Sequence, residues 1–439
     1  MASRQRVDAS RLAAYDVLKA VRVDDAYANL ALPHVIAEHG LSGRDAAFTT
    51  ELVSGTIRWQ GTYDAIIDAC LTKPRLEAKV RDALRLGVHQ LLAMRVPDHA
   101  AISSSVELIR ARVGVGPAGL TNAVLRKVSG HDLDGWIRRV APDPSTDPVG
   151  FASVAHSHPR WVVEAFTEAL GGADELAALL AADNAAPRVT LVARPGQAEV
   201  AELLAAGGEP GRLSPYAVTL VGGDPSAIPA VADGRAGIQD EGSQLVALTL
   251  AQADVVGRDA RWLDVCAGPG GKAALLAALA AERGALVLAN ERQHHRARLV
   301  VRGVRASSAG LLGVVTGDGT RPPWREESFD RVLVDAPCSG LGALRRRPES
   351  RWRRTPADLD DLVPLQRRLL TRAIDAVRPG GVVVYATCSP VLAETSGVVD
   401  AVLAEREDAQ LEAVRQLWPH RDGTDAMFIA TIRRTHLGS

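Results

Sequence analysis

The sequence contains few aromatic residues, few cysteines and almost no net charge, and each shortage excludes a class of protein. Phe, Trp and Tyr make up 4% of the 439 residues, so Ala, Leu and Val must pack most of the core. The formal net charge is −1, so the chain as a whole does not attract nucleic acid or an anionic membrane surface. Any binding of RNA must therefore come from local basic patches.

The cysteines Cys70, Cys266, Cys338 and Cys388 are too few and too widely spaced for a disulfide scaffold, and they suit a reducing cytosol. No Cys-x-x-Cys pair or His/Cys cluster has the spacing of metal ligands. No run approaches the ~18 apolar residues of a membrane span, and residues 1–20 lack the apolar segment of a signal peptide. We expect a cytoplasmic protein that binds neither a metal nor a membrane.

The chain is long enough for two or three domains. Amphipathic stretches throughout residues 1–140 predict an all-α bundle. The Pro- and Asp-rich stretch A-P-D-P-S-T-D-P-V-G (141–150) predicts a linker. Strand-like and helical stretches alternate over residues 151–245, which predicts a small α+β subdomain. Residues 246–439 are typical of a Rossmann-like α/β domain with a parallel sheet.

The stretch W-L-D-V-C-A-G-P-G-G-K (262–272) predicts a strand, a glycine turn and the start of a helix. Glycines let the backbone approach a ligand closely, and the helix N-terminus offers free N–H groups. The pattern also satisfies the G-x-G-x-x-[GA] dinucleotide fingerprint, but it lacks the residues of a phosphate-binding P-loop. The candidate cofactor-binding residues are Cys266, Ala267, Gly268, Pro269, Gly270, Gly271 and Lys272.

Two acids follow at the ends of the next two predicted strands. Glu291 can accept hydrogen bonds from both hydroxyls of a ribose, and Asp318 can accept one from the amino group of an adenine. This combination favours S-adenosylmethionine as the cofactor. The alternative that Asp318 is only a turn residue stays open.

Cys338 and Cys388 also follow predicted strands, so we expect both thiols to face the same crevice. Most free cysteines are small buried hydrophobic residues, which is our interpretation of Cys70, and Cys266 is expected to reach the cofactor only through its backbone. A thiolate beside a methyl donor is suited to attack C6 of a cytosine, which makes C5 nucleophilic. Asp335 can bind the ring at N3 or at the exocyclic amine.

Basic residues recur in two regions. In the helical region they include Arg4, Arg6, Arg11, Arg81, Arg85, Arg110, Arg112, Arg126 and Lys127, which form either a solvated face or an RNA-contacting surface. The stretch L-R-R-R-P-E-S-R-W-R-R (344–354) follows Cys338 directly, and its arginines and tryptophan are suited to phosphates and an unstacked base. The candidate RNA-binding residues there are Arg345, Arg346, Arg347, Arg351 and Trp352.

Longer motifs carry a family resemblance. The segments A-Y-D-V-L, F-T-T-E-L-V-S-G-T-I-R-W and L-T-N-A-V-L-R-K-V resemble the NusB-type RNA-binding helical domain over residues 8–130. The segments D-V-C-A-G-P-G-G-K, V-D-A-P-C-S-G and Y-A-T-C-S-P resemble the Sun/Fmu-type RNA (cytosine-5)-methyltransferases. The resemblance covers nearly the whole chain and implies a class I methyltransferase domain, S-adenosylmethionine as cofactor, and small-subunit ribosomal RNA as partner. Nothing in the sequence suggests more than a monomer.

The same resemblance assigns roles to residues. It implies that Cys388 is the nucleophile and that Cys338 helps to release the product, while residues 266–272, Glu291, Asp318 and Asp335 surround the cofactor. Glu291 stands where the family more usually has Asp, and residues 422–434 lack the usual aromatic pair after D-G.

Spacing alone leaves several alternatives open. It does not decide which of the two cysteines attacks, because DNA cytosine-5 enzymes use the cysteine of the Pro-Cys loop. The alternative substrates to small-subunit ribosomal RNA are DNA, transfer RNA and large-subunit ribosomal RNA. A chain that only binds RNA, with the methyltransferase domain as a scaffold, is the alternative from a different class.

Overall fold

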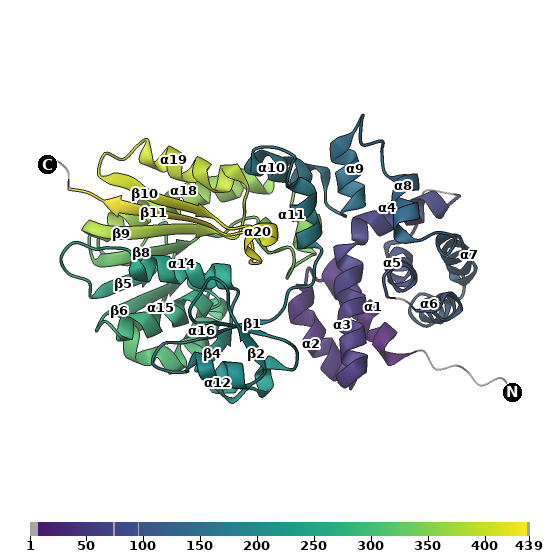
Figure 1. Ribbon diagram of the computed structural model, residues 1–439, viewed down its shortest axis with the longest axis horizontal. Coiled ribbons are helices and arrows are strands. Elements are labelled where there is room, and N and C mark those ends of the chain that lie inside the picture. The colour runs from purple at the N-terminus through teal and green to yellow at the C-terminus, as the bar shows by residue number, and fades with distance from the viewer. Residues whose placement is uncertain (1–7, 73–74, 95, 437–439) are drawn as a thin grey trace. The chain divides into compact units, whose positions relative to one another are not determined.

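The computed structural model describes residues 8–72, 75–94 and 96–436. Contacts divide the chain into two compact units (Figure 1). Unit 1 comprises the described residues up to Ala185 together with Leu344–Arg353, and unit 2 comprises Ala186–Ala343 together with the described residues from Arg354 onward. Among the helices of these described residues, none combines the length and the apolar character needed to span a bilayer.

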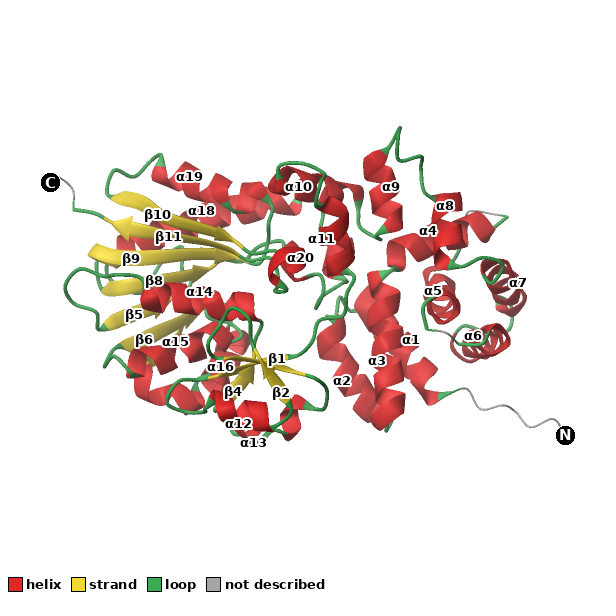
Figure 2. Ribbon diagram, viewed as in Figure 1, coloured by secondary structure: helices red, strands yellow, loops and turns green. Residues whose placement is uncertain are grey.

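Unit 1 is helical (Figure 2). Its helices are α1 (Ala9–Val23), α2 (Ala28–Glu38), α3 (Gly43–Arg58), α4 (Gln60–Cys70), α5 (Ala78–Leu92), α6 (Asp98–Arg112), α7 (Ala118–Val128), α8 (Leu133–Val140), α9 (Pro148–Ala155), α10 (Arg160–Leu170), α11 (Leu176–Asp183) and α17 (Ser350–Arg353). Alanines and leucines such as Ala13, Leu52 and Leu84 are fully buried where α1, α3 and α5 meet. The helical bundle expected from the amphipathic pattern is confirmed.

Residues 141–150 were expected to form a linker and residues 151–245 a separate subdomain. In the structure, residues 141–185 pack as part of unit 1. Asp147 accepts a hydrogen bond from Gly150 N (2.9 Å), which caps α9, and it pairs with Arg160. Hydrogen bonds from Thr62 Oγ1 to the carbonyl of Val154 and from Gly61 N to Ser157 Oγ then fasten the end of α9 to α4. The Pro- and Asp-rich stretch therefore starts a helix within the unit rather than separating two domains.

Unit 2 begins with a small antiparallel sheet in the order β2-β3-β1-β4. Its elements are β1 (Thr190–Ala193), α12 (Val200–Ala205), β2 (Gly208–Pro210), β3 (Ala217–Leu220), η1 (Pro225–Ala227), α13 (Pro229–Ala232) and β4 (Ala236–Ile238). Leu191, Leu203 and Val218 are fully buried in its own core. The α+β character predicted from the sequence is thus found in residues 190–238.

The rest of unit 2 is built on a seven-stranded sheet in the order β10-β11-β9-β8-β5-β6-β7. Its elements are α14 (Glu241–Gln252), β5 (Arg261–Asp264), α15 (Gly271–Ala281), β6 (Leu286–Glu291), α16 (His294–Gly303), η2 (Arg305–Gly310), β7 (Leu311–Thr316), β8 (Phe329–Asp335), η3 (Leu341–Ala343), α18 (Asp358–Ala376), β9 (Val377–Thr387), η4 (Leu392–Glu394), α19 (Ser396–Leu403), β10 (Ala409–Gln416), α20 (Pro419–Asp422) and β11 (Phe428–Arg434). Strands β9, β8, β5, β6 and β7 are parallel, and β11 and β10 join antiparallel.

Helices cover both faces of this sheet, with α14 and α15 on one face and α18 and α19 on the other. The parallel strands are consequently buried on both sides, as Val332, Leu333 and Val334 of β8 show. The predicted Rossmann-like α/β domain is confirmed.

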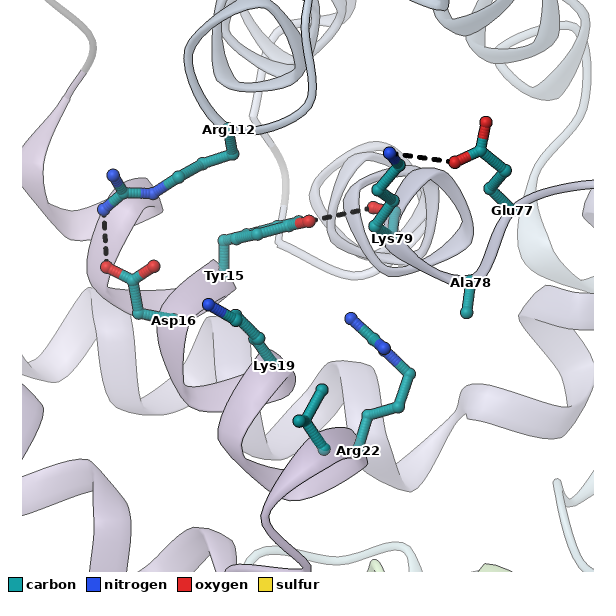
Figure 3. A pocket seen from close by; sticks show the side chains of 9 residues that line it. Tyr15, Asp16, Lys19, Arg22, Glu77, Ala78, Lys79 and Arg112 are labelled. Atoms are coloured by element: carbon teal, nitrogen blue, oxygen red, sulfur yellow. Dashed lines mark hydrogen bonds and ion pairs between the residues drawn. The ribbon is translucent and has the colours of Figure 1, made fainter.

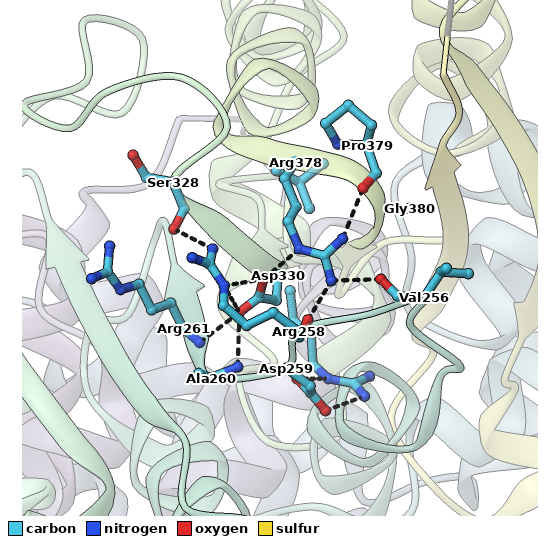
Figure 4. A network of polar contacts seen from close by, with 12 residues as sticks. Val256, Arg258, Asp259, Ala260, Arg261, Ser328, Asp330, Arg378, Pro379 and Gly380 are labelled. Atoms are coloured by element: carbon cyan, nitrogen blue, oxygen red, sulfur yellow. Dashed lines mark hydrogen bonds and ion pairs between the residues drawn. The ribbon is translucent and has the colours of Figure 1, made fainter.

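A buried carboxylate holds the starting ends of three adjacent strands together (Figure 4). Asp330 accepts hydrogen bonds from the backbone N–H groups of Ala260 and Arg261 (both 2.8 Å) and from Arg258 and Arg378. Burial raises its pKa, but these bonds outweigh burial, so the pKa of Asp330 lies below its ordinary value. Because β5, β8 and β9 are fixed in register at this end, their carboxyl ends also meet at one edge.

Candidate functional site

The turn between β5 and α15 lies at that edge and depends on two glycines. Gly270 has φ +118°, a backbone conformation that favours glycine. Gly268 N donates to Glu291 Oε2 (3.1 Å), and a Cβ at Gly268 would lie 2.1 Å from the same oxygen. Only a residue without a side chain allows this approach. The structure thus brings Glu291 against the predicted glycine turn.

Arg296 and Asn290 complete the end of β6, and the sequence analysis missed both. Arg296 donates to the carbonyl of Gly268 (2.7 Å) and lies 3.7 Å from the Glu291 carboxylate. Asn290 Nδ2 donates to the carbonyls of Val265 (2.8 Å) and Gly317 (3.1 Å). Asn290 therefore fixes the loops after β5 and β7 to the end of β6, and its position one residue before Glu291 is the only sequence signal for it.

Asp318 lies two residues beyond β7 and has a local role in the structure. Its Oδ1 accepts hydrogen bonds from Thr320 N (2.9 Å) and Thr320 Oγ1 (2.8 Å). The bond from the Thr320 N–H, then the bond from its hydroxyl, lowers the pKa of Asp318. The carboxylate is thus a turn residue just past the end of β7, at the edge of the sheet where the glycine turn also lies.

Asp264, Lys272 and Asp335 form a charged group beneath the turn. Lys272 Nζ donates to Asp335 Oδ2 (2.9 Å). Burial lowers the pKa of Lys272, but the charge of Asp335 more than compensates, so the net shift is upward. Burial, followed by the charge of Asp335, raises the pKa of Asp264 to about 8. At neutral pH the site therefore contains an ammonium–carboxylate pair and a protonated Asp264, which the sequence analysis did not single out.

The two candidate cysteines lie in loops that leave neighbouring parallel strands, β8 and β9. The backbone pairing of these strands continues through the bond from Ala336 N to the carbonyl of Ala386 (2.9 Å). Beyond it, Cys338 Sγ and Cys388 Sγ are 3.5 Å apart. The structure therefore brings together the two thiols that the sequence placed at separate strand ends.

The two sulfurs have different electrostatic surroundings. The hydrogen bond to Cys388, and then burial, raise the pKa of Cys338 well above its ordinary value. After burial and Asp335, the charge of Cys388 is a further cause of the shifted pKa of Lys272, so this ammonium and the sulfur interact. A cation nearby favours a thiolate on Cys388.

The remaining cysteines lie elsewhere. Cys266 occupies the glycine turn, where burial raises its pKa well above the ordinary value, and Cys70 is buried in α4 of unit 1. Among the groups of His, Cys, Asp and Glu in residues 8–72, 75–94 and 96–436, none could hold a metal ion.

The expectation that residues 345–352 form an RNA-contacting loop needs correction, because Leu344–Arg353 is part of unit 1. Arg351 is 0% exposed and donates to the carbonyl of Ser157 (3.1 Å) and to Asn184 Oδ1 (2.8 Å). Trp352 Nε1 donates to the carbonyl of Ile57 (3.3 Å). Both side chains serve as internal hydrogen-bond donors, and Arg351 is fully buried.

The three preceding arginines differ in how far their side chains are exposed. Arg345 is buried, Arg346 is half-buried, and Arg347 is exposed but lies over the ring of Tyr27 at 5.2 Å from its centroid. The run was expected to contact RNA, whereas the guanidinium of Arg351 binds the carbonyls of Ser157 and Asp183, which are distant along the chain.

The basic residues of α1 to α7 are also largely paired. Arg81 and Arg85 both bind Asp64, and Lys127 donates to the carbonyl of Cys70. Arg4 and Arg6 lie outside the described residues.

A cavity of about 680 Å³ opens within unit 1 (Figure 3). Its lining residues are Tyr15, Asp16, Lys19, Arg22, Val23, Glu77, Ala78, Lys79 and Arg112.

Comparisons with known proteins cover both units. The profile described as 16S rRNA methyltransferase RsmB/F matches residues 253–433, and that of the NusB family matches residues 8–130. Rv1407 of Mycobacterium tuberculosis, which its name places among methyltransferases, is 50% identical over 98% of this chain and 98% of its own. Ribosomal RNA small subunit methyltransferase B of Pseudomonas syringae is 32% identical over 91% of this chain and 88% of its own. The crystal structure of PH0851 shares the fold, with a TM-score of 0.80 and 21% identity over 98% of this chain and 99% of that one.

Proposed function

Because the chain belongs to the RsmB/F family of methyltransferases, we propose that it transfers a methyl group from S-adenosylmethionine to C5 of a cytosine in small-subunit ribosomal RNA. The observation that carries the proposal is the pair of sulfurs 3.5 Å apart at the ends of β8 and β9. One thiol can bond to the pyrimidine ring while the other handles a proton.

The residues at the edge of the sheet fit S-adenosylmethionine. Gly268 lets the Glu291 carboxylate lie directly against the turn, and the N-terminus of α15 offers backbone N–H groups to a ligand. Glu291 and Asp318 would bind the ribose hydroxyls and the adenine amino group. Bound there, the cofactor would supply an electrophilic methyl group.

In the proposed mechanism, the thiolate of Cys388 adds to C6 of the cytosine, and C5 gains the electron density needed to accept a methyl group. Lys272 favours the thiolate before addition. Asp335, held by Lys272 at 2.9 Å, binds the polar edge of the ring and orients it. The chain thus activates the substrate through its own residues.

Release needs a base, and Cys338 is suited to that role. Once Cys388 is bonded to C6, Cys338 loses the hydrogen bond that chiefly raises its pKa, so its thiol can give up its proton to solvent and the resulting thiolate can accept the C5 proton. The electron pair of the broken C5–H bond restores the C5–C6 double bond and expels Cys388 from C6. This division of roles agrees with the family assignment of attack to Cys388 and release to Cys338.

The relatives' names support ribosomal RNA as the substrate, and the basic cavity in unit 1 offers a place for its phosphates. Lys19 in this cavity is exposed, while Arg112 is paired with Asp16 (2.5 Å) and Lys79 with Glu77 (2.9 Å). Phosphate oxygens can replace such carboxylate partners because both groups are anionic acceptors.

The test compares two single variants with ribosomal RNA and tritiated S-adenosylmethionine. Cys388→Ala should neither methylate RNA nor form an adduct. Cys338→Ala should methylate C5 but fail to release, which leaves a protein–RNA band that migrates slowly in denaturing gels. Cys70→Ala is the control, since Cys70 lies in unit 1. An adduct formed by Cys388→Ala but not by Cys338→Ala would reverse the roles, and transfer to a base other than cytosine would refute the proposed reaction.

A further inference from the structure

Glu394 is a fully buried carboxylate near the two thiols, and the mechanism above does not use it. It ends η4, six residues after Cys388. Its Oε1 accepts hydrogen bonds from Ser339 N (2.7 Å) and Gln366 Nε2 (3.1 Å). Its Oε2 accepts one from Ser389 Oγ (2.6 Å) and one from Ser339 Oγ. Both oxygens are thus occupied by donors.

The two serines are the residues that directly follow the two cysteines, Ser339 after Cys338 and Ser389 after Cys388. Their hydroxyls are 3.0 Å apart and converge on the same carboxylate oxygen. A single side chain therefore joins the loop after β8 to the loop after β9, one residue away from the pair of sulfurs.

The surroundings hold this carboxylate in place. Gln366 of α18 also donates to the carbonyl of Pro337 (2.8 Å), and the hydroxyl of Tyr385 in β9 donates to the carbonyl of Glu394 (2.7 Å). A carboxylate accepts at both oxygens, whereas an amide would present an N–H₂ group to at least one set of donors. Glutamate therefore accepts all four bonds from Ser339, Ser389 and Gln366 at its two oxygens.

We propose that Glu394 is a positioning residue that clamps the Cys338 and Cys388 loops, so that the two sulfurs stay close enough to act on one ring. This role rests on the proposed covalent mechanism, because only there do both thiols act on one ring. The hydrogen bonds of Glu394 reach the two loops at Ser339 and Ser389. It acts through Ser339 and Ser389.

Two measurements test the clamp, and the first needs no RNA. The oxidant diamide takes two electrons and two protons from neighbouring thiols, which form a disulfide while its azo bond is reduced to a hydrazine. In the wild-type protein, Cys338 and Cys388 should cross-link rapidly, as peptide mapping by mass spectrometry would show. Glu394→Gln should cross-link about tenfold more slowly, because displacements near 1 Å cost factors of this order or more.

The second measurement is methyl transfer. Glu394→Gln should lower kcat by about 10- to 100-fold and leave KM for S-adenosylmethionine unchanged, because the cofactor turn is not touched. Glu405→Gln is the matched control, since Glu405 is exposed in the same unit. If the Glu394→Gln protein cross-linked at the wild-type rate and had the wild-type kcat, the proposal would be overturned.

Two further variants cover the case in which Glu394→Gln does not fold. Ser339→Ala and Ser389→Ala each remove one hydroxyl with little change of volume. Each should slow the cross-linking, and normal cross-linking in both would also overturn the proposal. If the wild-type protein cross-links through a clamp of this kind but methylates no cytosine, the proposed function fails while the positioning role of Glu394 stands.

Discussion

A methyl group added at Gly268 should destroy the cofactor site without unfolding the protein. A Cβ there would lie 2.1 Å from Glu291 Oε2, whereas real Cβ atoms essentially never approach below 3.0 Å. The atom that must move is the far end of a flexible side chain, so Gly268→Ala can be accommodated. The movement nevertheless displaces Glu291 and breaks the bond from Gly268 N (3.1 Å).

The magnitude follows from the bonds that are lost. If Glu291 accepts hydrogen bonds from the ribose hydroxyls, as proposed, its displacement breaks them, and hydrogen bonds to a charged group contribute about 1.5–3 kcal/mol. The dissociation constant for S-adenosylmethionine should therefore rise by about 10- to 100-fold. Isothermal titration calorimetry of the RNA-free protein measures it directly.

The control for this prediction is Gly313→Ala on β7, since nothing lies within 4 Å of a Cβ at that position. Both variants should unfold at temperatures near that of the wild-type protein. If Gly268→Ala bound S-adenosylmethionine as tightly as Gly313→Ala, Glu291 would not be a cofactor ligand and the reasoning would be refuted.

The remaining predictions concern the surroundings of the site and unit 1. With its pKa raised to about 8, Asp264 holds a proton in the folded state that it loses on unfolding, so stability contributed by this group falls as pH rises from about 4 to about 8. Melting temperatures of Asp264→Asn should lack this fall, and an unchanged pH dependence would contradict the assignment. Arg351→Ala should lower the melting temperature but leave the salt dependence of RNA binding unchanged, with Arg347→Ala as the exposed control. Lys19→Ala should reduce the slope of log K against log salt by about 1 if it binds a phosphate, as filter binding would measure. Gly342→Ala should reduce methyl transfer, because its Cβ would lie 2.0 Å from the carbonyl oxygen of Ala426 and 2.9 Å from the backbone of Cys388; full activity would show that this loop can move.

The sequence predicted the fold and the meeting of the two thiols, because both follow from strand ends. Parallel strands place their carboxyl ends at one edge, so Cys338 and Cys388 are brought together although they are 50 positions apart in the sequence. The glycine turn was equally predictable. Gly270 is required by its positive φ, and Gly268 is required because the Glu291 carboxylate lies against it.

What the sequence did not predict depends on partners distant along the chain. The sequence around Arg351 does not show whether its guanidinium binds a phosphate or the carbonyl of Ser157. Glu394 stands in an unremarkable A-E-T stretch, and its importance appears only when Ser339 and Ser389 converge on it. Likewise, nothing local shows that residues 141–185 pack with the helical unit, because the bonds to Gly61 and Thr62 that hold them come from α4.

The central claim is that the sulfur of Cys388 bonds transiently to C6 of a cytosine. The most direct measurement digests the slowly migrating complex of Cys338→Ala with protease and nuclease and maps the attached nucleotide by mass spectrometry. We predict the mass of a methylated cytidine nucleotide on the peptide that contains Cys388. A nucleotide attached to another residue, or a protein that methylates cytosine while neither variant ever forms an adduct, would contradict the account.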